Sequence, residues 1–244
     1  MDGPLVVPVL VVLAGLILAA LCYYLFMSSN SQLFGRFPFR VATTKKILAL
    51  TFDDGPNQPY TSELLGVLKK RGIKATFFIV GKNLERAPQV GCDIVKDGHC
   101  VGNHSYSHAF STFFSRSSFL HDLEHNQDVI SEIVGIRPTL FRPPWLFRLP
   151  WILTEVRTCG LIPVSGLFGS ELEIFQPRAE VIFWRALRKA KPGVILIFHD
   201  GYNATNGNRR QTILAIDKLI PALKAQGYAF VTVPELLQAS PAER

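Results

Sequence analysis

A regular alternation of short apolar runs and amphipathic segments begins near Val41 and continues almost to the end of the chain, and it constrains the fold more than any other feature. Several of the apolar runs are continuous, which is typical of strands buried on both faces of a parallel sheet. We expect strands at residues 47–52, 75–80, 99–102, 139–141, 161–165, 194–198 and 228–232. Seven strands separated by helices predict a parallel α/β fold.

The segments between these strands end in helix stop signals, because a glycine or a proline follows each of them closely. The expected helices are residues 61–70, 88–96, 118–134, 149–159, 178–190 and 211–226. A small, incomplete α/β barrel of about seven parallel strands accommodates this count, and an open doubly wound sheet is the alternative. No GxGxxG motif follows the first strand, so nucleotide binding has no support.

The segment from Leu5 to Met27 contains no charged residue, and as a helix it would be about 34 Å long, enough to cross the core of a bilayer. No Lys or Arg precedes it and its apolar run is long, which favours an uncleaved anchor over a signal peptide. Tyr23 and Tyr24 are typical of aromatic residues at the membrane interface. We therefore expect one transmembrane helix that holds the protein in the cell membrane.

On this interpretation the chain divides into a membrane anchor at residues 1–28, a juxtamembrane linker at 29–40 and a folded domain at 41–244. The orientation of the anchor stays open. The nearest positive charges follow the apolar segment, and the positive-inside rule would keep that side in the cytoplasm.

The net charge of the chain is +7, from 26 Lys and Arg against 19 Asp and Glu, which favours anionic surroundings such as lipid headgroups or acidic glycans. The basic runs at 69–74 and 185–191 fall at helical spacing and lack interleaved aromatic residues. A nucleic-acid groove combines basic residues with interleaved aromatic residues, so we expect no nucleic-acid partner.

Two adjacent carboxylates, Asp53 and Asp54, end the first expected strand in the sequence ILALTFDDGP. Neighbouring buried anions repel each other, so they need a compensating charge unless they belong to a plain turn. His104 and His108 follow the third expected strand in GNHSYSH, and their spacing lets one turn of chain present both imidazoles to a single ion. Together with Asp54 they form a typical ligand set for Zn²⁺ or a similar ion.

Two further polar residues end expected strands. Arg142 lies in LFRPPW, where two prolines restrict the backbone that presents it, and His199 lies in ILIFHDG. Alone, each would be interpreted as a surface charge or a structural histidine. However, both fall at the carboxyl ends of parallel strands, as the carboxylates and the histidine pair do. Catalytic groups of α/β barrels collect at that face, so we expect a single site there.

The motifs TFDDGP, HSYSH, RPP and FHD occur in this order, and they resemble those of the polysaccharide deacetylase family, also called the NodB-homology or carbohydrate esterase family 4 domain. The resemblance spans roughly residues 46–237, and the first two motifs are the specific ones. It implies a distorted (β/α) barrel that uses a metal ion to remove N-acetyl, sometimes O-acetyl, groups from glycans. Because polymeric envelope glycans lie outside the membrane, it also implies an N-acetylated glycan substrate and an extracytoplasmic domain.

The resemblance also assigns roles. The implied metal ligands are Asp54, His104 and His108. The implied general base is Asp53, kept ionised by the cation and by Arg142, and His199 would protonate the departing amine. The implied ion is divalent, with Zn²⁺ expected first and Co²⁺, Ni²⁺ or Mn²⁺ as alternatives.

The sequence departs from the family pattern after the fifth expected strand, where members carry a Trp and an Asp that tunes the catalytic histidine. Gly166 stands about where the Trp belongs, and Gly169 or Ser170 stands near the expected Asp. Glu171 or Glu173 could replace that Asp only if the loop shifts. Two alternatives therefore stay open: hydrolysis of a non-glycan amide or ester at the same metal site, and glycan binding with impaired catalysis.

Four phenylalanines lie in the sequence HAFSTFFSRSSF, directly after the second motif: Phe110, Phe113, Phe114 and Phe119. Such side chains pack in a core, stack on sugar rings or enter a membrane surface. The sequence leaves these alternatives open.

Overall fold

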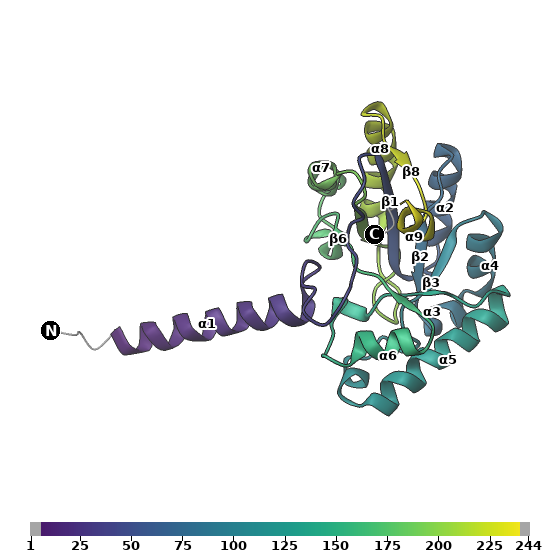
Figure 1. Cartoon of the computed structure of the whole chain (residues 1–244). Coiled ribbons are helices and arrows are strands. Elements are labelled where there is room, and N and C mark those ends of the chain that lie inside the picture. Colours follow the sequence, from purple (N-terminus) through teal and green to yellow (C-terminus); the bar gives the residue numbers. More distant parts are fainter. Residues whose placement is uncertain (1–5, 240–244) are drawn as a thin grey trace.

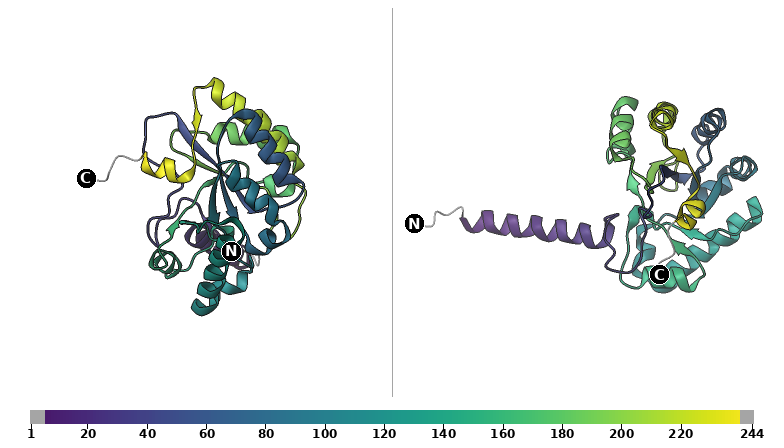
Figure 2. Two further views of the ribbon diagram at one scale, coloured as in Figure 1. Left: turned by 90° about the vertical axis from the view of Figure 1, so that its right-hand side faces the viewer. Right: turned by 45° about the horizontal axis from the view of Figure 1, so that its top comes forward.

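The computed structural model describes residues 6–239, so residues 1–5 of the expected anchor and 240–244 of the expected domain lie outside the described residues. One helix, α1 (Val6–Met27), leaves the α/β body as a straight rod (Figure 1). A second viewing direction in Figure 2 shows the same projection. The apolar stretch Val7–Met27 is long enough to cross a membrane, and none of its most apolar window is buried against the body.

Eight strands form one sheet in the part of the chain that the structure describes. They are β1 (Ile47–Gly55), β2 (Thr76–Ile79), β3 (Cys100–Asn103), β4 (Leu140–Phe141), β5 (Ile162–Pro163), β6 (Leu167–Phe168), β7 (Ile195–His199) and β8 (Ala229–Phe230). Seven of them confirm the expected strands. The eighth, β6, was not predicted, because two residues between Gly166 and Gly169 carry no periodic signal.

The strands run in the order β5-β4-β3-β2-β1-β7-β6, with β8 also paired to β1, and all of these ladders are parallel. Among the described residues, β5 and β6 form the two ends of the sheet and share no ladder. Around the sheet the strands follow chain order from β1 to β5, and from β6 through β7 back to β1, as in a barrel with a gap between β5 and β6. This order confirms the distorted, incomplete barrel and excludes the open doubly wound alternative, whose strand order reverses at a switch point.

Six helices confirm the predicted ones: α2 (Tyr60–Arg71), α4 (Pro88–Lys96), α5 (Arg116–Val134), α6 (Ile152–Thr158), α7 (Ala179–Lys189) and α8 (Arg210–Ala225). The glycine stop signals act as expected, since Gly72 and Gly135 take left-handed conformations at the ends of α2 and α5. Two short helices, α3 (Gly81–Arg86) and α9 (Val233–Gln238), and three 3₁₀ turns were not predicted, because they are shorter than two helical turns. The turns are η1 (Phe110–Phe114), η2 (Pro144–Leu146) and η3 (Glu173–Phe175).

The alternation of side chains along β1 determines which residues reach the inside of the barrel. Leu48, Leu50 and Phe52 are buried in the cluster that also holds apolar residues of α2 and α8. Ala49 belongs instead to a cluster with Val233 and Leu236 of α9. Thr51 and Asp53 share the parity of Ala49, so the strand directs both of these polar side chains inward.

The residues between α1 and the first strand lie against the body. Phe37 is fully buried with Leu146, Leu153 and Ile197. The backbone N–H of Val41 donates to Gly193 O at 2.8 Å. Residues 29–40, expected as a juxtamembrane linker, therefore contact the folded domain through a buried side chain.

Candidate active site

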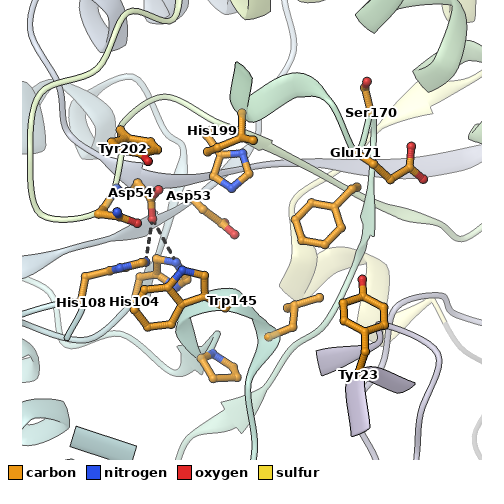
Figure 3. A pocket seen from close by; sticks show the side chains of 15 residues that line it. Tyr23, Asp53, Asp54, His104, His108, Trp145, Ser170, Glu171, His199 and Tyr202 are labelled. Atoms are coloured by element: carbon orange, nitrogen blue, oxygen red, sulfur yellow. Dashed lines mark hydrogen bonds and ion pairs between the residues drawn. The ribbon is translucent and has the colours of Figure 1, made fainter. Parts of the chain in front are cut away.

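The carboxyl ends of β1, β3 and β7 meet at one cleft, shown in Figure 3. Five of the six predicted site residues line it: Asp53, Asp54, His104, His108 and His199. The sixth, Arg142, is fully buried next to Asp53. The cavity has a volume of about 310 Å³, at the small end of the usual range for ligand sites, roughly 300 to 1,000 Å³.

Asp54, His104 and His108 converge on one point. Asp54 Oδ1 lies 3.3 Å from His104 Nε2 and 3.0 Å from His108 Nε2, as the dashed lines in Figure 3 mark. One ligand atom of each residue lies within 4.8 Å of the others, and all three side chains are buried. This is the ligand set that the spacing of the two motifs predicts.

The donor chemistry of this cluster fits a cation. His104 Nδ1 lies 2.7 Å from Arg142 O, and since a carbonyl oxygen only accepts, Nδ1 carries the proton. A neutral His104 then turns the lone pair of Nε2 toward the Asp54 carboxylate. Two facing acceptors repel unless a positive charge lies between them, so a divalent ion fits this geometry.

The Asp54 carboxyl is also held in its ionised form. Burial alone raises its pKa, but the charges and hydrogen bonds that His108, His104 and His199 supply when they are protonated and no ion is bound lower the pKa well below the usual range. Asn203 N donates to Asp54 Oδ2 at 2.9 Å and occupies the second oxygen. Asp54 therefore presents an ionised oxygen to the histidine pair.

The backbone at this point is strained, which the surrounding contacts support. Asp54 has a φ of 71° and His108 a φ of 50°, both in the left-handed region. Asn83 Nδ2 donates to Asp54 O at 2.7 Å. A Cβ added at Gly201 would lie 2.0 Å from the same oxygen, so only glycine fits there. Several elements thus hold Asp54 in the conformation that aims its carboxylate at both imidazoles.

Asp53 and Arg142 form a buried ion pair beside this cluster. Arg142 Nη1 lies 2.7 Å from Asp53 Oδ1 and donates to Thr51 Oγ1 at 2.7 Å, while its second Nη donates to Ser165 O at 2.8 Å. The guanidinium also lies 4.0 Å from the Phe78 ring centre. Burial lowers the pKa of Arg142 and the Asp53 charge opposes this effect. The pair fixes the direction of the Asp53 carboxylate.

His199 has a carboxylate partner, although the family pattern led us to expect none without a loop shift. Glu173, at the start of η3, places Oε2 2.6 Å from His199 Nδ1. Thr212 donates its hydroxyl to the other oxygen of Glu173. Burial alone would lower the pKa of His199, but the Glu173 charge and hydrogen bond raise it to about 9. His199 is therefore protonated at neutral pH.

Glu171, the second candidate for this role, points away from His199. Its carboxylate pairs with Lys189 and, at 3.3 Å, with Arg185 on the surface of α7. The identity of the partner depends on the path of the chain through β6 and η3, which the sequence pattern does not encode. Glu173, and not Glu171, is therefore the carboxylate that contacts His199.

Two aromatic residues complete the walls of the cleft. Trp145 packs edge-on against His108, with ring centres 4.4 Å apart, and Phe168 stacks on His199 at 6.2 Å. Trp145 was visible as the aromatic residue of LFRPPW, whereas Phe168 lies on the unpredicted strand β6. A third, Tyr23, comes from α1 and was expected only as a membrane-interface residue.

Comparison with known proteins agrees with this geometry. A family model described as polysaccharide deacetylase matches residues 40–164. A peptidoglycan-N-acetylglucosamine deacetylase of Bacillus cereus is 34% identical over 205 residues, which cover 84% of this chain and 94% of the relative. The crystal structure of a peptidoglycan N-acetylglucosamine deacetylase superposes with a TM-score of 0.76 at 30% identity, and covers 84% of this chain and 94% of its own.

The same fold also includes a protein described as a pseudoenzyme. The structure of this CE4 family pseudoenzyme from Bacillus anthracis gives a TM-score of 0.75 at 26% identity, over 85% of this chain and 71% of its own. Possession of this fold therefore does not by itself establish activity. On the family model and the full-length relative together, this chain belongs to the polysaccharide deacetylase family.

Proposed function

We propose that the protein is a metal-dependent hydrolase that removes N-acetyl groups from a glycan of the cell envelope. The observation that carries this proposal is that one cleft holds the Asp54, His104 and His108 cluster together with both an oriented carboxylate, Asp53, and a carboxylate-paired imidazole, His199.

The metal ion would be held by Asp54 Oδ1 and the Nε2 atoms of His104 and His108. A bound divalent ion supplies Lewis-acid polarisation of the acetyl carbonyl and acidifies water. Zn²⁺ suits two imidazoles and a carboxylate, and Co²⁺, Ni²⁺ or Mn²⁺ are the alternatives.

Asp53 and His199 divide the proton transfers between them. Asp53 faces the cleft as a carboxylate whose direction Arg142 fixes, so it accepts a proton from the attacking water. His199 carries a proton at neutral pH because Glu173 raises its pKa to about 9. It can therefore protonate the departing amine, which is a poor leaving group.

The alternative of a glycan-binding protein with impaired catalysis rested on the altered segment after the fifth strand. The contact between Glu173 and His199 weighs against it, because the carboxylate partner is present. The alternative of a non-glycan amide or ester is opposed by the two similar proteins described above, whose names specify peptidoglycan.

We also propose that α1 is retained as a single-pass membrane anchor with the domain on the extracytoplasmic side, where envelope glycans lie. Phe26 and Met27 at the end of α1 pack on the cluster that contains Phe147, and Arg148 N donates to Phe26 O at 2.9 Å. Cleavage near the end of this segment would remove part of the folded body. The intact mass of protein extracted from membranes tests this, and a mass lacking the first 27 residues would contradict it.

The activity is tested by acetate release from N-acetylglucosamine oligomers and from peptidoglycan fragments. The full chain, purified in detergent and loaded with Zn²⁺, is compared with the Asp53→Asn variant. We expect acetate release by the parent, and a loss of about 10²- to 10⁴-fold in the variant, as for removal of a general base.

Zn²⁺ binding is measured in parallel, because Asp53→Asn should leave the ligand cluster intact. Equal acetate release by both proteins would contradict the role of Asp53. Zn²⁺ binding without acetate release from either glycan would contradict the proposed function.

A further inference from the structure

The last turns of the membrane helix form part of the cleft wall. Tyr23 of α1 lines the same cavity as His199, and Figure 3 shows its side chain rising from α1 into the cavity, across from Asp54 and His108. Nothing in the hydrolytic chemistry requires a residue from a membrane anchor at this place. Its presence brings the membrane segment and the reacting groups into one structural unit.

Arg148 locks the end of α1 to the wall of the cleft. Its buried guanidinium donates to Ser28 O at 2.7 Å, to Ser31 O at 2.9 Å and to Leu146 O at 2.8 Å. Leu146 itself lines the cavity. Carbonyl groups that follow a helix carry partial negative charge, so a cation here stabilises the end of α1. The helix is therefore fixed to the cleft rather than joined to it by a free tether.

Two exposed aromatic residues lie near the end of α1. Phe114 is 67% exposed and Phe110 is 41% exposed, and both pack on Phe147, which contacts Phe26 of α1. Phe113 and Phe119 of the same sequence are buried, so the four phenylalanines divide between core and surface. Aromatic residues on a surface next to a membrane helix are typical of the bilayer interface.

The position of the cleft follows from these contacts. If the membrane interface lies at Tyr23 and Tyr24, as the sequence predicts, the apolar helix before them lies in the hydrocarbon core, and only about 6 Å of helix follows Tyr23, at 1.5 Å per residue. One wall of the cleft is therefore at the level of the lipid headgroups. Because Arg148 holds the folded body against the end of α1, the cleft cannot move away from the membrane surface toward a distant glycan layer.

We propose that the substrate is an N-acetylated saccharide carried on a membrane lipid, which enters the cleft from the bilayer surface. This inference rests on the proposed deacetylase function and on the retention of α1. A lipid-linked saccharide holds its first sugars at the headgroup level, next to Tyr23. The apolar side chains of Leu146 and Phe168 line the same cavity and can contact the part of the substrate nearest the lipid.

The test uses the full chain, loaded with Zn²⁺ and reconstituted in liposomes of phosphatidylglycerol and phosphatidylethanolamine. Acetate release is measured from undecaprenyl-diphosphate-linked N-acetylglucosamine oligosaccharide in the same liposomes, from the free oligosaccharide, and from soluble peptidoglycan fragments. We expect kcat/KM for the lipid-linked substrate to exceed that for the two soluble substrates by at least about tenfold.

Two variants separate a role of the cleft wall from simple enrichment at the membrane. Tyr23→Ala removes the wall residue, and Tyr24→Ala removes its neighbour, which is similarly exposed and does not line the cavity. We expect Tyr23→Ala to lower the rate on the lipid-linked substrate about fivefold, as for the loss of one aromatic contact, and Tyr24→Ala to change it less than about twofold. Thermal unfolding of both variants monitors folding.

The outcomes distinguish the inference from the function on which it rests. Acetate release at equal or higher efficiency from the soluble substrates, or equal effects of the two tyrosine variants, would overturn the lipid-linked substrate and leave the deacetylase function standing. Absence of acetate release from every substrate, with Zn²⁺ bound, would overturn the function itself.

Discussion

The two halves of the cleft are built in different ways. The proposed metal half takes Asp54 from the end of β1 and His104 and His108 from the segment after β3, on the two sides of β2, and a hydrogen bond from Asn83 to Asp54 O supports the left-handed conformation of Asp54. The acid half joins His199 of β7 to Glu173 of a short 3₁₀ turn, and the pair is held by side-chain hydrogen bonds. On the proposed function, ion binding would depend on the strand scaffold, whereas the proton affinity of His199 would depend on the loop that carries Glu173.

The largest expected effect comes from removing the anionic side chain of the Asp54, His104 and His108 cluster. Asp54→Asn keeps a residue that tolerates a positive φ but removes the anionic ligand. We expect acetate release to fall at least about 10³-fold, because the bound ion contributes several kcal/mol to stabilising the transition state. Acetate release and Zn²⁺ affinity by calorimetry measure this. Full activity with lost Zn²⁺ binding would separate the cluster from catalysis.

Removal of the Arg142 guanidinium, which pairs with Asp53, has the next largest expected effect. Arg142→Met leaves the Asp53 carboxylate buried without its partner, so the free energy of unfolding should fall by about 3 to 5 kcal/mol. Urea unfolding in detergent measures this loss. The double variant Asp53→Asn with Arg142→Met should recover part of it, and a double variant that is no more stable than Arg142→Met would contradict the ion-pair explanation.

In the acid half, Glu173→Gln should change the pH dependence of acetate release. In the parent, we expect the rate to fall as His199, whose pKa is raised to about 9, loses its proton. Without the Glu173 carboxylate, burial lowers the pKa of His199, so the fall moves to lower pH. At pH 8 we expect a loss of about 10²-fold in acetate release, the lower range for a general acid, and a smaller loss near pH 6.

The same pair makes a pH-dependent contribution to stability. The pKa of His199 in the folded protein, about 9, exceeds its ordinary value of 6.5, so the contribution is complete below pH 6.5 and is lost as pH rises through 9. Glu180→Gln is the matched control, because Glu180 pairs with Lys218 on the surface. If Glu173→Gln lowered the free energy of unfolding by the same amount at every pH, the Glu173 carboxylate would have a structural role only.

The smallest expected effect concerns the support of Glu173. Thr212→Val removes the hydroxyl that donates to the Glu173 carboxylate and accepts from Gln176 Nε2 at 2.8 Å, and should cost about 2 kcal/mol, the usual contribution of two hydrogen bonds. The pH–rate profile of this variant should shift in the direction of Glu173→Gln but by less. A shift larger than that of Glu173→Gln would place the tuning of His199 elsewhere.

The parts of the fold that the sequence predicts are those with long periodic signals. Strand β1 and helices α2, α4 and α8 combine apolar patterns with glycine or charge signals at their ends. Strand β6 and helices α3 and α9 are too short to repeat a hydrophobic pattern often enough for it to be recognised. Strand β6 forms through its pairing with β7, which local residues do not determine, whereas α9 begins with a capping box of Thr232 and Glu235 that hydrophobic periodicity does not detect.

The same contrast applies to the site. The proximity of Asp54, His104 and His108 could be predicted from the sequence, because the carboxyl ends of parallel strands meet at one edge of the sheet. The choice of Glu173 over Glu171 could not, because it depends on where a loop turns. The place of Tyr23 in the cleft could not either, because it depends on how α1 docks through Arg148.

The most direct test of this account is acetate release by the full chain from N-acetylglucosamine oligomers before chelation, after chelation and after Zn²⁺ is added back. We predict that release stops when the ion is removed, returns when Zn²⁺ is restored, and does not return in Asp54→Asn. Release that persists through chelation, or fails to appear although Zn²⁺ is bound by the Asp54 cluster, would contradict it.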